Sequence, residues 1–216
     1  MTDATDTGKA VRSRENTRER LLTAATQVFA EKGLAGATVD DLTTAAGFTR
    51  GAFYSSFSSK EEVFDQAVQQ VLDRIFSTAR EGVSRVDLCG DIFSDVEALI
   101  SSVESDVRLL SRIELETCLA ALRHPELRET YLNIRAVMRE QIASIITESV
   151  HVHGRSLLID PNALADAVIA LYFNAINLAE VEGRETSTAV IVTHLINAFA
   201  SDPLNLSEAT ARRSAR

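Results

Sequence analysis

Residues 37–64 read ATVDDLTTAAGFTRGAFYSSFSSKEEVF, and this stretch begins with the signals of a short helix. Thr38 offers a hydroxyl N-cap three residues before the carboxylate of Asp41, a variant of the capping box with aspartate in place of glutamate. Gly47 then interrupts the helical pattern. The stretch therefore predicts a short helix at about residues 39–46.

A second short helix is predicted directly after this one. Thr49 is a suitable N-cap for a helix over residues 50–55. Two short helices joined by a turn that contains glycine form a helix-turn-helix. We therefore expect this supersecondary motif within the first sixty or so residues.

Longer helices are predicted on both sides of the pair. Between residues 16 and 32 apolar side chains recur three and four positions apart, and Gly33 follows as a C-terminal stop. Residues 59–62 form another capping box, which opens a helix that we expect to run to about Arg80.

Composition favours a packed helical protein. Of 216 residues, 45% are hydrophobic and 25% charged, while only 9 are glycine and 3 are proline. The net charge of −9 argues at first against nucleic acid, but residues 9–60 carry +3 and residues 61–216 carry −10. This asymmetry would direct one end of the molecule towards DNA phosphates.

The chain is expected to consist of four parts. We predict a mobile arm over residues 1–13, a helix-turn-helix domain over 14–60, a larger helical domain over 61–201 and a mobile tail over 202–216. Both ends are polar and lack periodicity. The expected fold class is all-α.

Residues 17–64 resemble the DNA-binding domain of the TetR family of transcription regulators. The resemblance rests on the segments TRERLLTAA (17–25), FAEKG (29–33), ATVDDL (37–42), AAGFTRGAFY (45–54) and FSSKEE (57–62). It covers under a quarter of the chain. It implies a homodimeric, sequence-specific regulator of double-stranded operator DNA, expected to be a repressor that a small molecule releases.

The resemblance makes the second helix of the pair the recognition helix. A major groove about 12 Å wide admits one helix, and Arg50 can pair bidentately with a guanine edge or grip a phosphate. Ser56 and Ser58 depart from the histidine and proline that the family often has at these positions. The predicted DNA-binding residues are Thr38, Thr49, Arg50, Gly51, Ala52, Tyr54, Ser55, Ser56 and Lys60.

The larger domain is predicted to have helices near residues 91–104, 106–123, 126–150, 161–182 and 187–200. The last two helices are apolar on more than one side, and a partner subunit is the simplest cover for the second side. This agrees with the four-helix dimer interface that the resemblance implies. Predicted interface residues are Leu164, Val168, Leu171, Ala175, Ile191, Leu195 and Phe199.

The same domain would hold the effector, expected to be mostly apolar. The candidate ligand-binding residues are Phe76, Phe93, Ile113, Glu114, Cys118, Tyr131, Met138, Tyr172 and Asn174. Most of them could equally be plain core. As an alternative, this domain could bind a protein partner rather than a small molecule.

The alternative from another functional class is that the protein is an enzyme. Its only candidate metal feature is the pair His151 and His153, which are two residues apart and do not share a helix face. Catalytic and dinucleotide motifs are absent, so no cofactor, metal or catalytic residue is expected. Cys89 and Cys118 lack ligand spacing. With no apolar run of about 20 residues and a polar start, we expect a cytoplasmic protein that does not enter the membrane.

Overall fold

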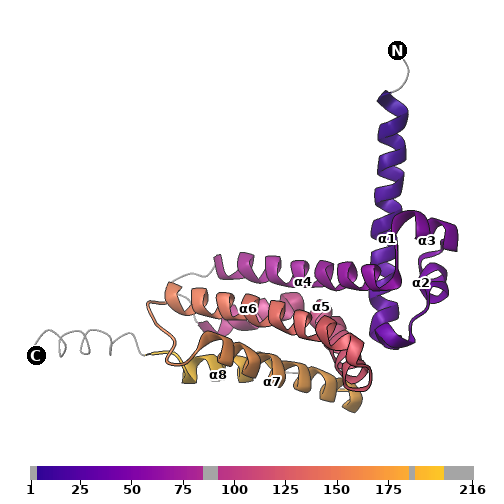
Figure 1. Cartoon of the computed structure of the whole chain (residues 1–216). Coiled ribbons are helices and arrows are strands. Elements are labelled where there is room, and N and C mark those ends of the chain that lie inside the picture. The colour runs from indigo at the N-terminus through magenta and orange to yellow at the C-terminus, as the bar shows by residue number, and fades with distance from the viewer. Residues whose placement is uncertain (1–3, 85–91, 185–187, 202–216) are drawn as a thin grey trace, which may run out of the picture. The chain divides into compact units, whose positions relative to one another are not determined.

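The computed structural model describes residues 4–84, 92–184 and 188–201, without the side chains of 4–14, 84, 92–96 and 188–189. These residues are almost entirely helical, as the sequence predicted (Figure 1). The elements in order are α1 (Ala4–Gly36), α2 (Val39–Ala46), α3 (Arg50–Ser56), α4 (Lys60–Ser84), α5 (Ile92–Arg123), a 3-10 turn (Pro125–Leu127), α6 (Arg128–Val152), α7 (Pro161–Glu182) and α8 (Thr188–Ala198).

Two boundaries differ from the sequence prediction. Residues 4–13, expected to form a mobile arm, belong to α1, and the two helices expected at 91–104 and 106–123 are one helix, α5. Neither glycine nor proline interrupts α5 near Ser105, and an ion pair between Glu104 and Arg108 spans the expected break at 2.5 Å. The predicted tail, 202–216, lies outside the described residues.

The chain divides into two compact units by its internal contacts. The first unit comprises Met1–Asp73 and Leu109–Tyr131, and the second comprises Arg74–Arg108 and Leu132–Arg216. The divisions therefore fall inside α4, α5 and α6. The predicted boundary at residues 60 and 61 coincides with the start of α4, which continues to Ser84.

The first unit is built on α1, with α2 and α3 beside it (Figure 1). Its core contains fully buried aromatic rings, and those of Phe29 and Phe64 meet edge to face with centroids 5.0 Å apart. Gly33 has φ 66° and kinks α1 near its end. A Cβ atom there would lie 3.1 Å from a carboxylate oxygen of Glu116 on α5, so the two helices approach closely at a residue without a side chain.

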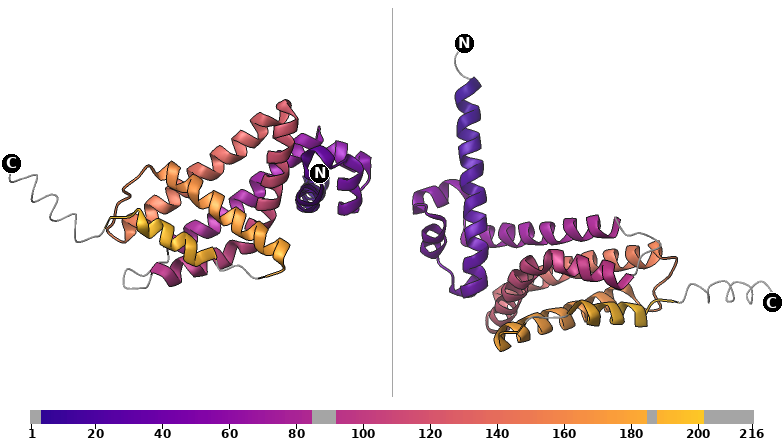
Figure 2. Two further views of the ribbon diagram at one scale, coloured as in Figure 1. Left: turned by 90° about the horizontal axis from the view of Figure 1, so that it is seen from below. Right: turned by 180° about the vertical axis from the view of Figure 1, so that it is seen from behind.

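The second unit contains α7 and α8, which pack against each other, with most of α6 (Figure 2). A loop after α6 holds the end of α8. Arg155 donates from Nε to the Ser201 carbonyl (2.7 Å) and from a terminal nitrogen to the Asn197 side chain (2.5 Å), and a single antiparallel bridge joins Leu157 and Ala200. The end of α8 is therefore fixed within the unit by backbone and side-chain bonds.

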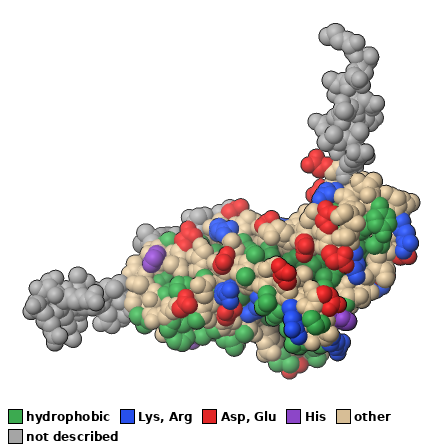
Figure 3. All heavy atoms as spheres, in the orientation of Figure 1, with side chains coloured by type: hydrophobic (Ala, Val, Ile, Leu, Met, Phe, Trp, Pro, Cys, Tyr) green, Lys and Arg blue, Asp and Glu red, His purple; other side chains and the backbone are tan. Residues whose placement is uncertain are grey.

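Helix α7 is strongly apolar, as the sequence indicated. By length and composition alone it could cross a membrane, with a mean hydropathy of 1.4 over 18 residues, of which 39% are buried inside the protein. Hydrophobic side chains are visible in Figure 3 along the lower edge, where Figure 1 draws α7 and α8. The exposed large ones on these helices are Leu171, Leu178, Val181, Val190 and Ile191.

Candidate nucleic-acid interface

Helix α2 starts with the capping box that the sequence predicted. The Thr38 hydroxyl accepts from the Asp41 N–H (3.2 Å), and the Asp41 carboxylate accepts from the Thr38 N–H (2.9 Å). Lys32 of α1 donates to the same carboxylate at 2.6 Å. The hydrogen bond from Lys32, followed by those from Thr38, lowers the pKa of Asp41 from 3.8 to about 2.

The turn after α2 depends on one glycine. Gly47 has φ 70° and ψ 34°, a left-handed conformation that costs a residue with a side chain about 1–2 kcal/mol. Its N–H donates to the carbonyls of Thr43 and Thr44, which ends α2. Two residues later the Thr49 hydroxyl accepts from the Ala52 N–H (3.2 Å) and starts α3. The helix-turn-helix is therefore set by local caps.

The buried side of α3 is held by aromatic rings. Phe53 is fully buried and Phe57 nearly so, and their ring centroids lie 5.9 Å apart. Phe57 also ends the helix, with its N–H bonded to the Phe53 carbonyl. These two side chains fix which face of α3 is turned towards the core.

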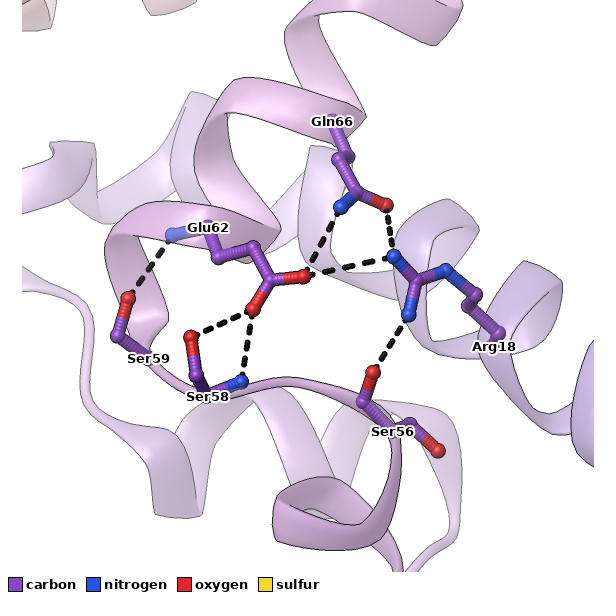
Figure 4. Close-up of polar contacts among 6 residues, drawn as sticks. All are labelled: Arg18, Ser56, Ser58, Ser59, Glu62 and Gln66. Atoms are coloured by element: carbon purple, nitrogen blue, oxygen red, sulfur yellow. Dashed lines mark hydrogen bonds and ion pairs between the residues drawn. The ribbon is translucent and has the colours of Figure 1, made fainter.

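Arg18 of α1 joins three parts of the first unit, as Figure 4 shows. Its guanidinium donates to the Ser56 carbonyl at the end of α3 (2.5 Å) and to Gln66 (2.7 Å) on α4, and it lies 4.4 Å from the Phe57 ring centroid. Glu62 accepts from Arg18 as well (3.4 Å). Sequence reasoning missed this role, because nothing in the spacing of Arg18 indicates partners so distant in sequence.

Glu62 fixes the entry into α4. Its carboxylate accepts from both the N–H and the hydroxyl of Ser58, each at 2.7 Å, and these bonds lower the pKa of Glu62 (Figure 4). The Ser59 hydroxyl accepts from the Glu62 N–H at 3.1 Å, as predicted for a capping box. The returning bond goes to Ser58 rather than to Ser59.

The opposite face of α3 is turned to solvent. Of the predicted DNA-binding residues, Ala52, Ser56 and Lys60 are half-buried, and the exposed ones are Thr38, Thr49, Arg50, Gly51, Tyr54 and Ser55. The Tyr54 ring is 60% exposed and rests edge-on against Phe53, with centroids 5.2 Å apart. The structure therefore brings most of these residues together on one accessible surface.

Several of these side chains already have partners within the first unit. The Thr38 hydroxyl donates to Asp41, and those of Ser55 and Ser56 donate to the Ala52 carbonyl. The Lys60 ammonium donates to the carbonyls of Leu34 and Ala37, at 2.7 and 2.8 Å, and so caps the end of α1. One ammonium hydrogen remains for another acceptor.

Arg50 is paired with Asp40, an acid in the first turn of α2. Its Nε donates to Oδ1 of Asp40 at 2.5 Å, and its Nη2 donates to Oδ2 at 2.9 Å. Both side chains are exposed, at 62% and 64%. The pair joins the first residue of α3 to the second residue of α2 on the solvent side of the motif.

The predicted ligand-binding residues are divided between the two units. Ile113, Glu114, Cys118 and Tyr131 lie in the first unit, whereas Phe76, Met138, Tyr172 and Asn174 lie in the second, and the side chain of Phe93 is outside the described residues. Within the first unit the Tyr131 hydroxyl donates to Glu114 (3.0 Å), and burial raises the pKa of Tyr131. In the second unit Asn174 is exposed, so it does not line an interior.

Surface hollows in the second unit involve other residues. A hollow of about 490 Å³ is lined by Ala143, Ser144, Thr147, Glu148, His151, Val152 and Pro161. Another, of about 400 Å³, is lined by Arg139, Glu140, Asp160, Asn162, Ala163 and Asp166. None of the predicted ligand-binding residues lines either hollow.

The predicted dimer-interface residues separate into two groups by exposure. Leu164 and Val168 are buried within the protomer, so they pack in its own core. Leu171 and Ile191 are exposed, and Ala175, Leu195 and Phe199 are half-buried. The exposed group continues along α7 to Leu178 and Val181, which the sequence analysis did not select.

Comparison with known proteins identifies the same segment. Residues 21–67 match the model of the family described as bacterial regulatory proteins, tetR family. The HTH-type transcriptional repressor KstR2 of Rhodococcus jostii is 34% identical over 128 residues, which are 54% of this chain and 62% of that protein. The chain thus covers less than two thirds of KstR2. The HTH-type transcriptional repressor DhaR of a Mycobacterium species is 27% identical over 90% of this chain and 98% of that protein.

The fold of the whole chain also has counterparts among solved structures. A TetR family transcriptional regulator from Cytophaga hutchinsonii superposes with a TM-score of 0.65, at 23% identity, over 88% of this chain and 98% of that one. The reduced form of NemR from E. coli gives a TM-score of 0.65 at 16% identity, over 87% and 98%. Together with the capped helix-turn-helix and its solvent-facing α3, these matches show that residues 21–67 are similar to the tetR family of bacterial regulatory proteins and that the chain has the fold of solved TetR-family regulators.

Proposed function

We propose that this protein is a homodimeric repressor that reads operator DNA through α3 and leaves it when a small, mostly apolar ligand binds. The observation that carries the DNA-binding surface is the exposed side of α3, where Arg50 and Tyr54 stand on a helix whose other side is fixed by Phe53. The repressor assignment follows the names of the relatives KstR2 and DhaR. Its place of action would be the cytoplasm, where such DNA lies.

Dimerisation is supported by the apolar surface of α7 and α8. TetR-family regulators bind operator DNA and act as dimers. Here Leu171 is 43% exposed and Val181 is 86% exposed, on a helix whose other side is buried. Contiguous apolar surface of this kind marks protein contacts. A two-fold pairing would also set two recognition helices about one DNA turn apart.

The proposal that a ligand releases the protein from DNA is supported by similarity to TetR-family regulators rather than by a cavity in the structure. The buried Phe76, Met138 and Tyr172 of the second unit are the apolar groups that such a ligand would meet. For release, the ligand must bind the DNA-incompetent state more tightly, and operator DNA must weaken ligand binding by the same factor. If the second unit binds a protein partner instead, no small molecule would show this reciprocity.

The DNA assignment is tested by selecting duplexes from a randomised pool with the full-length protein. We expect one pseudo-palindromic sequence to be enriched, and its binding constant to fall with salt at a slope of about −0.9 per neutralised phosphate on a log–log plot. The Arg50→Ala variant should lose about 1–3 kcal/mol of operator affinity. A second variant, Tyr54→Phe, keeps the ring and so measures what the Tyr54 hydroxyl alone contributes to operator affinity. Enrichment of no sequence would contradict the proposal.

A further inference from the structure

The pairing of Arg50 with Asp40 has a geometry that matters for reading bases. Arginine has five N–H donors in one plane. Asp40 occupies the side edge of the guanidinium, formed by Nε and Nη2. The end edge, formed by Nη1 and the second hydrogen of Nη2, has no hydrogen-bond partner within the part of the chain that the structure describes. That edge can bind the O6 and N7 acceptors of guanine in the bidentate manner of specific arginine contacts.

The neighbouring residues Asp40 and Asp41 of α2 bind different partners. Asp41 is bound to Thr38 and Lys32, which hold the start of the helix. Asp40 uses its carboxylate only for Arg50 among the described residues. Its exposure limits what this contact adds to stability, because solvent-exposed ion pairs contribute about 0–1 kcal/mol. The fold therefore does not depend on the carboxylate of Asp40.

We propose that Asp40 is a positioning residue for sequence recognition: it fixes the plane of the Arg50 guanidinium so that its end edge meets a guanine. The inference rests on the DNA-binding function proposed above and specifies how one base is read. A long arginine side chain loses rotamer freedom when it binds, and a partner that already orders it reduces that loss on DNA.

Asp40 has a second effect on binding. The negative charge of Asp40 compensates the positive charge of Arg50, so the pair contributes little to the attraction of phosphates on any sequence. Asp40 thus raises discrimination between bases and lowers affinity for DNA in general. Removing it should change these two quantities in opposite directions, which a merely structural residue would not do.

The test uses the full-length protein and the duplex selected as above, together with variants of that duplex mutated at each position. Asp40→Asn is compared with Glu31→Gln, which removes one charge from an exposed acid of α1 that does not bond to Arg50. We expect Asp40→Asn to reduce the preference for guanine at one position per half-site by up to about fivefold, the factor that corresponds to the upper limit for an exposed ion pair. Binding to a duplex of unrelated sequence should strengthen. Glu31→Gln should leave the base preference unchanged.

A double variant makes the test specific to Arg50. If Asp40 acts through Arg50, then Asp40→Asn has no further effect on base preference in an Arg50→Ala background. Two results would overturn the inference while leaving the DNA-binding function intact. One is unchanged guanine preference in Asp40→Asn, and the other is a tighter operator complex with full preference, which would make Asp40 a simple electrostatic barrier. Failure of the wild-type protein to select any sequence would instead refute the proposed function.

Discussion

Helices α3 and α7 both present side chains to solvent, but their surfaces differ in chemistry and in how they arise. Helix α3 has seven residues, begins at the Thr49 cap, and exposes Arg50 and Tyr54. Helix α7 has 22 residues and exposes Leu171 and other apolar side chains. Short-range capping bonds orient the first surface. The second is left exposed because packing within one protomer covers only part of an apolar helix. A single protomer therefore exposes a polar surface on α3, which suits DNA, and an apolar surface on α7, which suits contact with another protein chain.

The largest expected effect comes from substitutions on the two sides of α7, which should have different consequences. Leu171→Glu should leave the protomer folded, because Leu171 is 43% exposed, but should dissociate the dimer by burying an unpaired charge at a cost of about 3–5 kcal/mol. Leu164→Glu is the control, since Leu164 is fully buried in the protomer and its replacement should unfold the chain. Sedimentation velocity and far-UV circular dichroism measure the two outcomes. A dimeric Leu171→Glu protein would remove α7 from the interface.

A smaller effect distinguishes two glycines of the helix-turn-helix. A Cβ atom at Gly51 would meet only the Thr49 hydroxyl at 3.7 Å, an ordinary contact, so Gly51→Ala should stabilise α3 by about 0.5–1 kcal/mol. If the backbone of α3 approaches DNA closely, the same variant loses operator affinity. Gly47→Ala should instead destabilise the fold by about 1–2 kcal/mol, because φ is 70° there.

Urea denaturation and operator titration of both glycine variants check this comparison. Stability and affinity should change in opposite directions for Gly51→Ala. Equal operator binding by Gly51→Ala and the wild-type protein would mean that the backbone at residue 51 stays away from DNA.

The smallest expected effect concerns the cap that supports α2. The folded pKa of Asp41 is about 2, below its ordinary value of 3.8, so its ionised form favours the folded state. This contribution is complete above about pH 4 and is lost as the pH falls towards 2. Asp41→Asn should therefore show a smaller decrease in the free energy of unfolding between about pH 5 and pH 2 than the wild-type protein. Equal acid sensitivity of the two proteins, measured by urea denaturation, would contradict this role.

Local signals account for what the sequence predicted well. Thr38, Asp41, Gly47 and Thr49 act on residues at most four positions away, so their caps could be predicted without knowing the rest of the fold. The fold class and the family resemblance followed from the same segment. In contrast, the continuity of α5 through residue 105 was not predicted, although neither glycine nor proline interrupts the helix there.

Contacts between distant segments were beyond sequence reasoning. Arg18 binds residues 38 to 48 positions away, and the pair of Arg50 with Asp40 spans a turn whose angle no spacing rule predicts. Similarly, exposure alone distinguishes Leu164 from Leu171, although both share one apolar stripe in the sequence. The candidate effector residues had the weakest basis, because burial in a core and burial against a ligand demand the same side chains.

The close approach of Gly33 to Glu116 has a consequence for how the protein is made. Glu116 belongs to a segment, Leu109–Tyr131, that joins the first unit only after the chain has passed through the second. The chain therefore crosses between the units three times, and no single proteolytic cut separates the first unit from the second. During synthesis, α1 to α3 leave the ribosome early, yet their unit is complete only when residue 131 has emerged. A fragment that ends at residue 73 would lack the part of α5 against which α1 bends.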